Sequence, residues 1–381
     1  MKIILVGPVY PYRGGNALYV SHLYDVLKEK FGVEIINYKL LYPKILFPGT
    51  SQEDKSSVKI KEVPSRRIIN SINPISWIKA AKIIKKENAN LVVFDWWNPF
   101  FGPCHYTISS FLKKQYKDKI LFITENVISH EKRFIDKLLT KIGLKNADTF
   151  LVLSSSVENT VKYYSGEKKI YKSALPIYDC YQFENEIDNN KTKKELGFKV
   201  DDKVILFFGY IRKYKGLLNL IEALPDILQT HPNSKLLVVG EFYDSPDEYI
   251  GKIKELNLND NVIIVNEFVP NEEVGKYFSV SDVVVLPYKS GTQSGVLNIA
   301  YGFHKPVVVT RVGSLPDDVE EEKTGIVVEP NNKNELVNGI NRFFELSNSV
   351  NFGENIKNKI NSQEFSKVTS VFEKIISDSN K

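Results

Sequence analysis

The chain has 381 residues, of which 43% are hydrophobic and 25% are charged, and its formal net charge is +5. This length exceeds one ordinary domain and suits two, and the composition is that of a soluble globular protein with ample core. The mildly basic balance is compatible with an anionic substrate or with contact at a membrane surface, and it gives no reason to expect nucleic acid as a partner.

The cysteines and the first residues further restrict the class of protein to which the chain can belong. Cys104 and Cys180 are the only cysteines, and no C-x-x-C or H-x-x-x-H spacing occurs, so neither a disulfide framework nor structural zinc is expected. Residues 2–7 are too short an apolar run for a signal peptide, and no window of about 18 apolar residues occurs that would span a membrane. We therefore expect a cytoplasmic protein.

The first strand is expected at residues 2–7, before a loop with two glycines and a helix from about residue 17 to residue 30. Gly14 and Gly15 lie in this loop, where the absence of a Cβ lets the backbone approach a ligand closely and adopt positive φ. An ordinary turn is the alternative.

The next elements are a strand at residues 33–38 and a long polar connection, residues 40–63, of a length that is uncommon unless the loop is functional or mobile. Residues 74–88 predict an amphipathic helix. Its inward residues are expected to be Ile75, Ile78, Ala81 and Ile84, and its outward ones Lys79, Lys82, Lys85 and Lys86. Such a lysine face is either solvated or in contact with anionic lipid headgroups.

Two further strands of the first half end in residues that suit a binding site. Residues 91–95 precede Trp96 and Trp97, which either stack on a sugar or an isoprenoid or pack in the core. Residues 119–124 precede Glu125, Asn126 and His130, and the alternative for His130 is that it lies beside a helix N-cap. Residues 149–154 are expected to be the last strand of this half.

The second half begins after a polar linker. Its first strand, residues 203–208, leads into Gly209, Arg212 and Lys215 and then a helix at residues 217–229. Cations beside glycines at a strand's carboxyl end suit a diphosphate, because arginine donates two parallel hydrogen bonds and lysine is a point charge. A solvated basic turn is the alternative. Later strands are expected at residues 235–240 and 261–265, and Glu267 follows the second.

Residues 282–325 read as strand, loop, helix, strand and glycine turn, which is the crossover unit of a parallel sheet. The loop residues are Thr292, Gln293, Ser294 and Gly295. Their N–H groups and the dipole of the following helix form a site for an anion such as a diphosphate, although Thr292 or Ser294 acting only as a helix cap is the alternative. Neither G-x-G-x-x-G nor the P-loop motif occurs here.

This stretch resembles the donor-site segment of the family-4 retaining glycosyltransferases. The residues in register with the family pattern are Ala300, Lys305, Pro306, Val307, Val308, Gly313, Asp317 and Gly325. Two glutamates of that pattern are absent, and their places lie near Gly291 or Thr292 and near Ile299. The resemblance implies the α/β fold called GT-B, with two facing Rossmann-like domains whose parallel sheets are covered by helices.

The resemblance also implies the domain order. Residues 1–180 would form an N-terminal Rossmann-like acceptor domain and residues 181–200 a linker. Residues 201–360 would form the Rossmann-like donor domain, and residues 361–381 a helix that returns toward the N-terminal domain.

Roles for individual residues follow from the same resemblance. Arg212 and Lys215 would stabilise the charge of the leaving nucleotide, with Tyr210 standing where the family has its arginine. Glu125 takes the place of a family histidine and would stabilise an oxocarbenium ion or act as base. The donor-binding residues would be Gly14, Gly15, Gly209, Glu267, Thr292, Gln293, Ser294 and Gly295. The acceptor-binding residues would be Trp96, Trp97, Asn126 and His130.

The implied activity is transfer of a sugar from a nucleotide diphospho-sugar to an acceptor hydroxyl, with retention and with neither metal nor cofactor. The acceptor would be a saccharide or a lipid-linked saccharide in surface polysaccharide or glycolipid assembly, with peripheral contact at the inner face of the cell membrane as one option. Because the family glutamates are absent, a catalytically silent GT-B protein that serves another transferase as a partner subunit is an alternative. A nucleotide-sugar epimerase on the same fold is a third.

Overall fold

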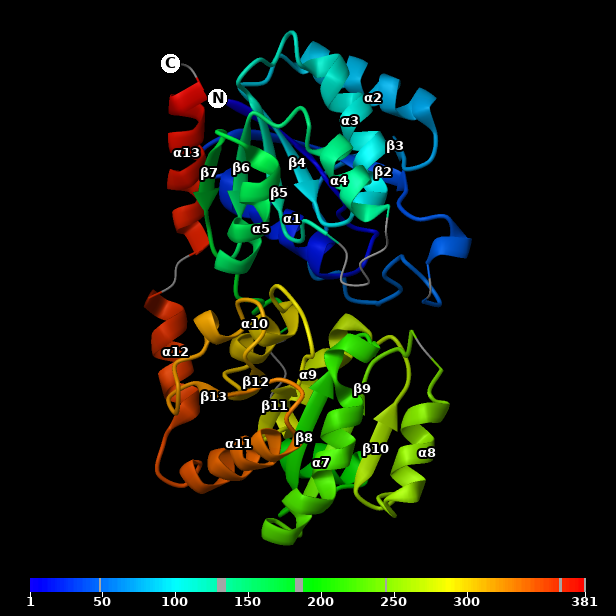
Figure 1. The fold of residues 1–381 in the computed structure, drawn as a ribbon, viewed down its shortest axis with the longest axis vertical. Helices are drawn as coiled ribbons and strands as arrows, with labels where there is room; N and C mark the ends of the chain where they lie inside the picture. Colours follow the sequence, from blue (N-terminus) through cyan, green and yellow to red (C-terminus); the bar gives the residue numbers. More distant parts are fainter. Residues whose placement is uncertain (48, 129–134, 182–187, 244, 363–364, 380–381) are drawn as a thin grey trace. The chain divides into compact units, whose positions relative to one another are not determined.

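The computed structural model describes residues 1–47, 49–128, 135–181, 188–243, 245–362 and 365–379, and the chain forms two compact units (Figure 1). The first unit contains Met1–Asp54, Lys61–Pro176 and Phe365–Lys381. The second contains Lys55–Ile60 and Ile177–Glu364. Each unit therefore combines stretches that are far apart in the sequence.

The first unit is built on a parallel sheet of seven strands in the order β3-β2-β1-β4-β5-β6-β7. The strands are β1 (Lys2–Val6), β2 (Gly32–Leu40), β3 (Arg66–Asn70), β4 (Leu91–Trp96), β5 (Ile120–Thr124), β6 (Thr149–Val152) and β7 (Lys169–Lys172). The central strands are apolar runs, and Ile4, Val92 and Leu121 are fully buried. Such runs are needed because helices cover both faces of a parallel sheet.

Helices cover each face of this sheet (Figure 1). They are α1 (Gly15–Leu27), α2 (Pro74–Glu87), α3 (Gly102–Leu112), α4 (Asp136–Gly143), α5 (Ser155–Ser165) and α13 (Val368–Ser379). On one face α2 buries Trp77 and Ile84. On the other face α13 buries Phe372 and Ile376, in the same core as Leu23 of α1. The C-terminal helix is thus part of the first unit.

The second unit has a parallel sheet of six strands in the order β10-β9-β8-β11-β12-β13. The strands are β8 (Lys203–Phe208), β9 (Ser234–Val239), β10 (Val262–Val265), β11 (Val283–Leu286), β12 (Val307–Thr310) and β13 (Gly325–Val328). The helices are α6 (Asn189–Glu195), α7 (Leu217–Thr230), α8 (Asp247–Glu255), α9 (Asn271–Val280), α10 (Gly295–Gly302), α11 (Lys333–Leu346) and α12 (Phe352–Ser362). Leu224 of α7 and Ile340 of α11 share one core. The ring of Phe278 of α9 lies 4.9 Å from that of Phe208 in a tilted arrangement.

Both sheets reverse their strand order at the first strand of the unit. β1 lies between β2 and β4, and β8 lies between β9 and β11. In open parallel sheets ligands bind beyond the carboxyl ends of the strands at such a reversal. The loops after β1, β4, β8 and β11 are therefore the places to look for function.

The expected α/β architecture of two parallel sheets flanked by helices is confirmed. The expectation that β6 is the last strand of the first half is wrong, because β7 pairs with β6 at the sheet edge. β7 and the other edge strand, β3, carry exposed cationic residues such as Lys169 and Arg66, since one side of an edge strand faces water.

The predicted linker, residues 181–200, contains part of the second unit. Residues 182–187 lie outside the described residues, but α6 follows with Asp188 as its N-cap and Thr192 buried. Phe198 is buried as well. Along the described ranges, no helix is long and apolar enough to cross a bilayer.

Residues 55–60, from the long polar connection of the first half, join the second unit at the start of α9. The Ser57 hydroxyl and N–H donate to Glu272 Oε1 at 2.6 and 3.1 Å, and the Val58 N–H donates to Oε2 at 3.3 Å. Asn271 Nδ2 donates to the Val58 carbonyl at 3.0 Å. Four hydrogen bonds of Ser57 and Val58 thus fix this short segment on the helix.

Candidate functional site

The loop after β8 brings two cations together beside a glycine turn. Lys215 ends the short 3-10 turn Lys213–Lys215 and is only 8% exposed. Burial and the neighbouring Arg212 lower the pKa of Lys215 to about 7, and among the described residues Arg212 is the only charge that acts on it. A buried ammonium group that meets a second cation is stabilised by an added anion.

Glycine is required at both ends of this loop. Gly209 has φ of 97°, and a Cβ there would lie 3.3 Å from Lys215 Nζ, so the lysine lies directly over the glycine backbone. Gly216 has φ of 74°, and a Cβ there would collide with the Pro287 carbonyl. These two contacts bring the loop after β8 against the chain that leaves β11.

Aromatic rings surround the two cations. The Arg212 guanidinium lies 4.6 Å from the ring centroid of Tyr243, whose ring is 4.5 Å from that of Tyr210. Lys215 Nζ lies 5.7 Å from the ring centroid of Tyr288. Faces of aromatic rings attract cations, so these rings keep both side chains at the carboxyl end of the sheet.

The loop after β11 leads into α10 without a side-chain cap. Ser294 takes the N-cap position, but within the described part of the chain its side chain makes no capping hydrogen bond. Its Oγ instead lies 3.2 Å from the hydroxyl of Tyr288. The capping alternative is therefore wrong for Ser294. The first N–H groups of α10 lie at the positive end of the helix dipole.

The same loop is fixed from the opposite side. The Ser314 N–H donates to the Thr292 carbonyl at 2.8 Å, and a Cβ at Gly313 would meet the carbonyls of Gly291 and Thr292. Gln293 Oε1 is buried and, among the described atoms, accepts no hydrogen bond. A buried amide oxygen without a donor is costly, so it marks a place where a ligand donor would be favourable.

Glu267, another predicted donor-binding residue, lies after a different strand of the second sheet. It is exposed and follows β10, the edge strand, which lies two strands from β8. Glu241 was missed by the sequence reasoning. It is 6% exposed at the end of β9, the direct neighbour of β8, and the acidic residue after Gly240 was the available indication.

In the first unit the glycine loop after β1 begins α1. Gly14 is the N-cap with φ of 112°, which a side chain would disfavour, whereas a Cβ on Gly15 would meet nothing within 4 Å. Residues 51–54 run alongside this loop: the Arg13 N–H donates to the Gln52 carbonyl at 3.1 Å, and the Asp54 N–H donates to the Pro11 carbonyl at 2.7 Å.

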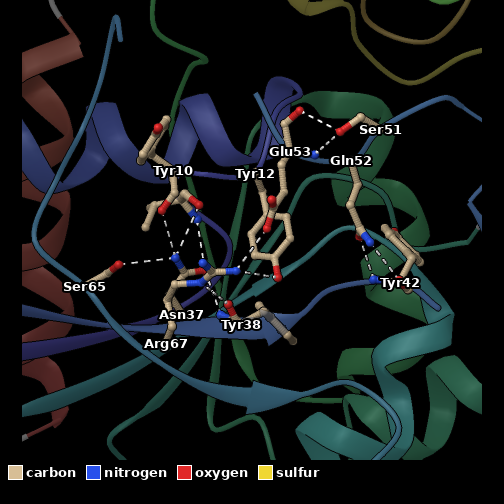
Figure 2. Close-up of polar contacts among 11 residues, drawn as sticks. Tyr10, Tyr12, Asn37, Tyr38, Tyr42, Ser51, Gln52, Glu53, Ser65 and Arg67 are labelled. Atoms are coloured by element: carbon tan, nitrogen blue, oxygen red, sulfur yellow. Dashed lines mark hydrogen bonds and ion pairs between the residues drawn. The ribbon is translucent and has the colours of Figure 1, made fainter. Parts of the chain in front are cut away.

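Figure 2 shows the side chains that fix these two segments. Asn37 of β2 donates to the Tyr10 carbonyl at 3.2 Å and accepts from the Val9 N–H at 3.3 Å. Arg67 of β3 donates to Glu53 at 3.2 Å and to the Tyr12 hydroxyl at 3.4 Å. The start of the long polar connection is therefore ordered against the glycine loop.

Glu125 and Asp95 form a buried carboxyl pair at the carboxyl ends of β5 and β4. They are 8% and 3% exposed. Burial raises the pKa of Glu125 to about 7, and burial together with the Glu125 charge raises the pKa of Asp95 well above its usual range. Asp95 was missed by the sequence reasoning, although a carboxylate inside the apolar run of residues 91–97 was visible.

The aromatic candidates after β4 divide into one core residue and one half-buried residue. Trp96 is fully buried, and its Nε1 donates to the Val127 carbonyl at 3.3 Å, so the expectation that it stacks on an acceptor is wrong and core packing holds. Trp97 is half-buried and donates to the Tyr42 hydroxyl at 2.9 Å. Asn126 is half-buried, and His130 lies outside the described residues.

The second half of the chain matches a known protein family. Residues 188–359 match the sequence profile of the family described as Glycosyl transferases group 1. That range contains the sheet of the second unit from β8 to β13 and the Arg212 and Lys215 cluster.

Curated relatives extend the match in sequence. The uncharacterized glycosyltransferase MJ1607 of Methanocaldococcus jannaschii is 33% identical over 150 residues, which are 39% of this chain and 38% of that protein. The N-acetyl-alpha-D-glucosaminyl L-malate synthase of Bacillus anthracis is 23% identical over 345 residues, which are 86% of this chain and 84% of that protein. The matched part spans about two fifths of the length of the first three curated relatives.

The whole chain is also similar in fold to a solved structure. The structure of Anabaena Alr3699/HepE in complex with UDP-glucose has a TM-score of 0.75 with this chain and covers 99% of this chain and 100% of that one, at 16% identity. At that identity the likeness concerns the fold. Residues 188–359 therefore resemble the glycosyl transferases group 1 family in sequence, and the whole chain resembles the solved structure in fold.

Proposed function

We propose that the protein transfers a sugar from a nucleotide diphospho-sugar to the hydroxyl group of an acceptor. The observation that carries this proposal is the buried Lys215 beside Arg212 at the strand-order reversal of the second sheet. A leaving nucleoside diphosphate would bring negative charge beside these two cations. Its binding would restore the charged form of Lys215, whose pKa burial has lowered.

The proposal needs no metal ion for charge neutralisation. Arg212, Lys215 and the uncapped N-terminus of α10 supply the positive charge that a divalent cation would bring to a diphosphate. We expect transfer to continue in the presence of EDTA, and a complete loss that Mg²⁺ or Mn²⁺ restores would contradict the metal-free proposal.

In the first unit Glu125 is the proposed catalytic carboxylate. Its place at the carboxyl end of β5 and its pKa of about 7 suit a group that stabilises positive charge on the sugar or takes a proton near neutral pH. Retention is part of the proposal and would be tested by the anomeric configuration of the product in NMR spectra.

The experiment is nucleotide binding by calorimetry without metal, with UDP, GDP, ADP, TDP and CMP. UDP comes first because the structurally similar HepE was solved with UDP-glucose. We expect micromolar binding of one diphosphate, at least ten-fold weaker binding by Lys215→Ala, and turnover lower by about two to three orders of magnitude. Lys213→Ala is the matched control, since its ammonium group is exposed and pairs with Glu248.

Equal losses in the two lysine variants would contradict the assignment of Lys215. The alternative of a catalytically silent partner subunit is favoured by the absent family glutamates, whose places include the buried Ile299. Tight diphosphate binding without either transfer or donor hydrolysis, over a panel of acceptors, would favour that alternative. Hydrolysis of the donor without an acceptor product would favour an epimerase.

A further inference from the structure

The carboxyl ends of β4 and β5 bring two acidic side chains onto the same face of the first sheet. Asp95 is opposite Ile123 in the parallel register, and Glu125 follows Ile123 by two residues. Residues two apart on an extended chain point the same way, so both carboxyl groups face the same side. The Glu125 N–H donates to the Trp96 carbonyl at 2.9 Å, which continues the strand pairing to Glu125.

The carboxyl groups of Asp95 and Glu125 are buried without hydrogen-bond donors among the described residues. Among the described atoms, both oxygens of Asp95 and Oε1 of Glu125 are buried and accept no hydrogen bond. Two ionised carboxylates that face each other have no hydrogen to share. Their side chains are nevertheless close enough to hydrogen bond once one of them carries a proton.

A third polar group points to a ligand at this place. Tyr19 of α1 is fully buried, its hydroxyl has no hydrogen-bond partner among the described residues, and it lies within the electrostatic reach of both carboxyl groups. It comes from a different element than the pair. Buried hydroxyl groups are normally hydrogen-bonded, so the Tyr19 hydroxyl is an independent indication that a polar ligand or its hydroxyl group completes the cluster.

Among the described residues, the groups around the pair offer no positive charge. Tyr19 from α1 and Tyr38 from β2 are the titratable groups that interact with Asp95, and no cation of the described residues contributes to either carboxyl group. Two negative charges side by side in a buried place without a cation are unstable. One proton must therefore stay on the pair.

We propose that Asp95 and Glu125 share one proton, with Asp95 donating it to Oε1 of Glu125, so that Glu125 presents Oε2 as a carboxylate to a hydroxyl group of the sugar ligand. Oε2 is the Glu125 oxygen outside the fully buried set, and it retains the contact with solvent. Asp95 is then a positioning residue for Glu125. The identity of the ligand rests on the proposed function, but the shared proton does not.

The shared proton has a consequence for stability. A carboxyl group whose pKa is higher in the folded protein than in the unfolded chain keeps its proton after the unfolded chain has lost it. The free energy of unfolding must then fall as pH rises from about 4, the ordinary carboxyl pKa, through the value of about 7 for Glu125, and fall further as Asp95, whose pKa is raised well above its usual range, loses the shared proton. The contribution is fully present at low pH and is lost at high pH.

The first test compares unfolding by denaturant at pH 5, 6, 7 and 8 for the wild type and for Asp95→Asn with Glu125→Gln. The two amides keep the shape of the pair and remove its protons. We expect the stability of the wild type relative to this double variant to decrease with rising pH. A difference that is the same at all four pH values would overturn the shared proton, whether or not the protein shows any transfer.

The second test separates positioning from packing by the pH dependence of transfer. Asp95→Asn keeps an N–H donor for Glu125, so the midpoint of the acid limb is expected to stay near that of the wild type. Asp95→Leu has no donor, so the midpoint should rise by about one pH unit and the rate at neutral pH should fall about ten-fold. Equal shifts in both variants would show that Asp95 acts only by packing and would overturn its role.

Failure of the proposed function is distinguishable from failure of this inference. Absence of transfer with a pH-dependent stability difference would reject the transferase and keep the carboxyl pair. Should Asp95→Leu not fold, Asp95→Ala replaces it, and the Asn variant remains the comparison that decides.

Discussion

Lys215 combines burial with a neighbouring cation, and this combination makes nucleotide binding depend on pH. In the protein without ligand its pKa is about 7, so the ammonium group loses its proton as pH rises above that value. A bound diphosphate favours the charged form. Above pH 7 binding must therefore be accompanied by uptake of a proton.

We expect the affinity for the preferred nucleoside diphosphate to fall by up to about ten-fold per pH unit between pH 7 and 9. Calorimetry in buffers of different ionisation enthalpy would measure both the affinity and the proton uptake. Lys215→Met is the matched variant, because it keeps the apolar stem and removes the titrating group. An unchanged slope in this variant would assign the dependence to another residue.

Individual residues also show which parts of the candidate site could be predicted from the sequence. Arg212 and Lys215 were predictable because a glycine turn with cations follows a short apolar strand. The pairing of Asp95 with Glu125 depends on the register of β4 against β5, which no local pattern encodes. On α2 the expected inward residue Ile75 is 77% exposed, and Trp77 and Ala80 are buried instead, since the helix is rotated by its packing.

At the scale of elements, Asn37 joins three segments of the first unit. It is fully buried in β2, and its amide bonds the backbone of Val9 and Tyr10 and the Ser65 hydroxyl (Figure 2). The glycine loop after β1 therefore depends on a side chain outside it. The residues of this network could not be predicted, because the long connection has no periodicity.

Asn37→Ala should lower the free energy of unfolding by about 2–4 kcal/mol, because it leaves buried backbone groups of the loop without partners. Chemical denaturation would measure the loss. Lys162→Met is the comparison: its ion pair with Glu158 on α5 is exposed, so a loss below about 1 kcal/mol is expected. Similar losses in the two variants would contradict the special position of Asn37.

The helix α2 presents a stripe suited to an anionic surface. Ile72, Ile75, Lys79, Lys82 and Lys86 are exposed at spacings of three and four residues, which places the four helical ones on one side of α2. Exposed isoleucines next to lysines are typical of helices that lie on anionic lipid. We propose this stripe as the peripheral membrane contact.

Co-sedimentation with vesicles that contain anionic lipid tests the stripe. Lys79→Glu with Lys82→Glu should reduce the bound fraction by at least five-fold at low salt, since each basic residue near the surface contributes about 1 kcal/mol. Lys114→Glu with Lys117→Glu changes the net charge equally on another exposed segment. If this control reduces binding as strongly, net charge rather than α2 is responsible.

For the molecule as a whole, the division of the chain is the feature that composition and periodicity predict least. The two parallel sheets follow from alternating apolar runs and helices, and the resemblance implied the return of the C-terminal helix. The membership of residues 55–60 in the second unit depends on the contact of Ser57 and Val58 with Glu272, which lies more than 200 positions away. Nothing in a polar stretch without periodicity indicates such a partner.

The contribution of α13 to the first unit can be measured with one core residue. Phe372→Ala should lower the free energy of unfolding of the first unit by about 3–5 kcal/mol, because the ring is fully buried among residues of α1 and the sheet. Ser370→Ala, on the exposed side of the same helix, should change it by less than about 0.5 kcal/mol. Equal stability of the two variants would mean that α13 is dispensable.

The position of α13 in the sequence also determines the order in which the two units can finish folding during synthesis. The ribosome makes the strands of the first unit early and the helix that covers one of their faces last, after all of the second unit. Until residues 365–381 emerge, the cores formed by Leu23 and its neighbours remain uncovered on that side. The half that is translated first is therefore the half that finishes folding last, and it is the half that nascent-chain chaperones would have to protect.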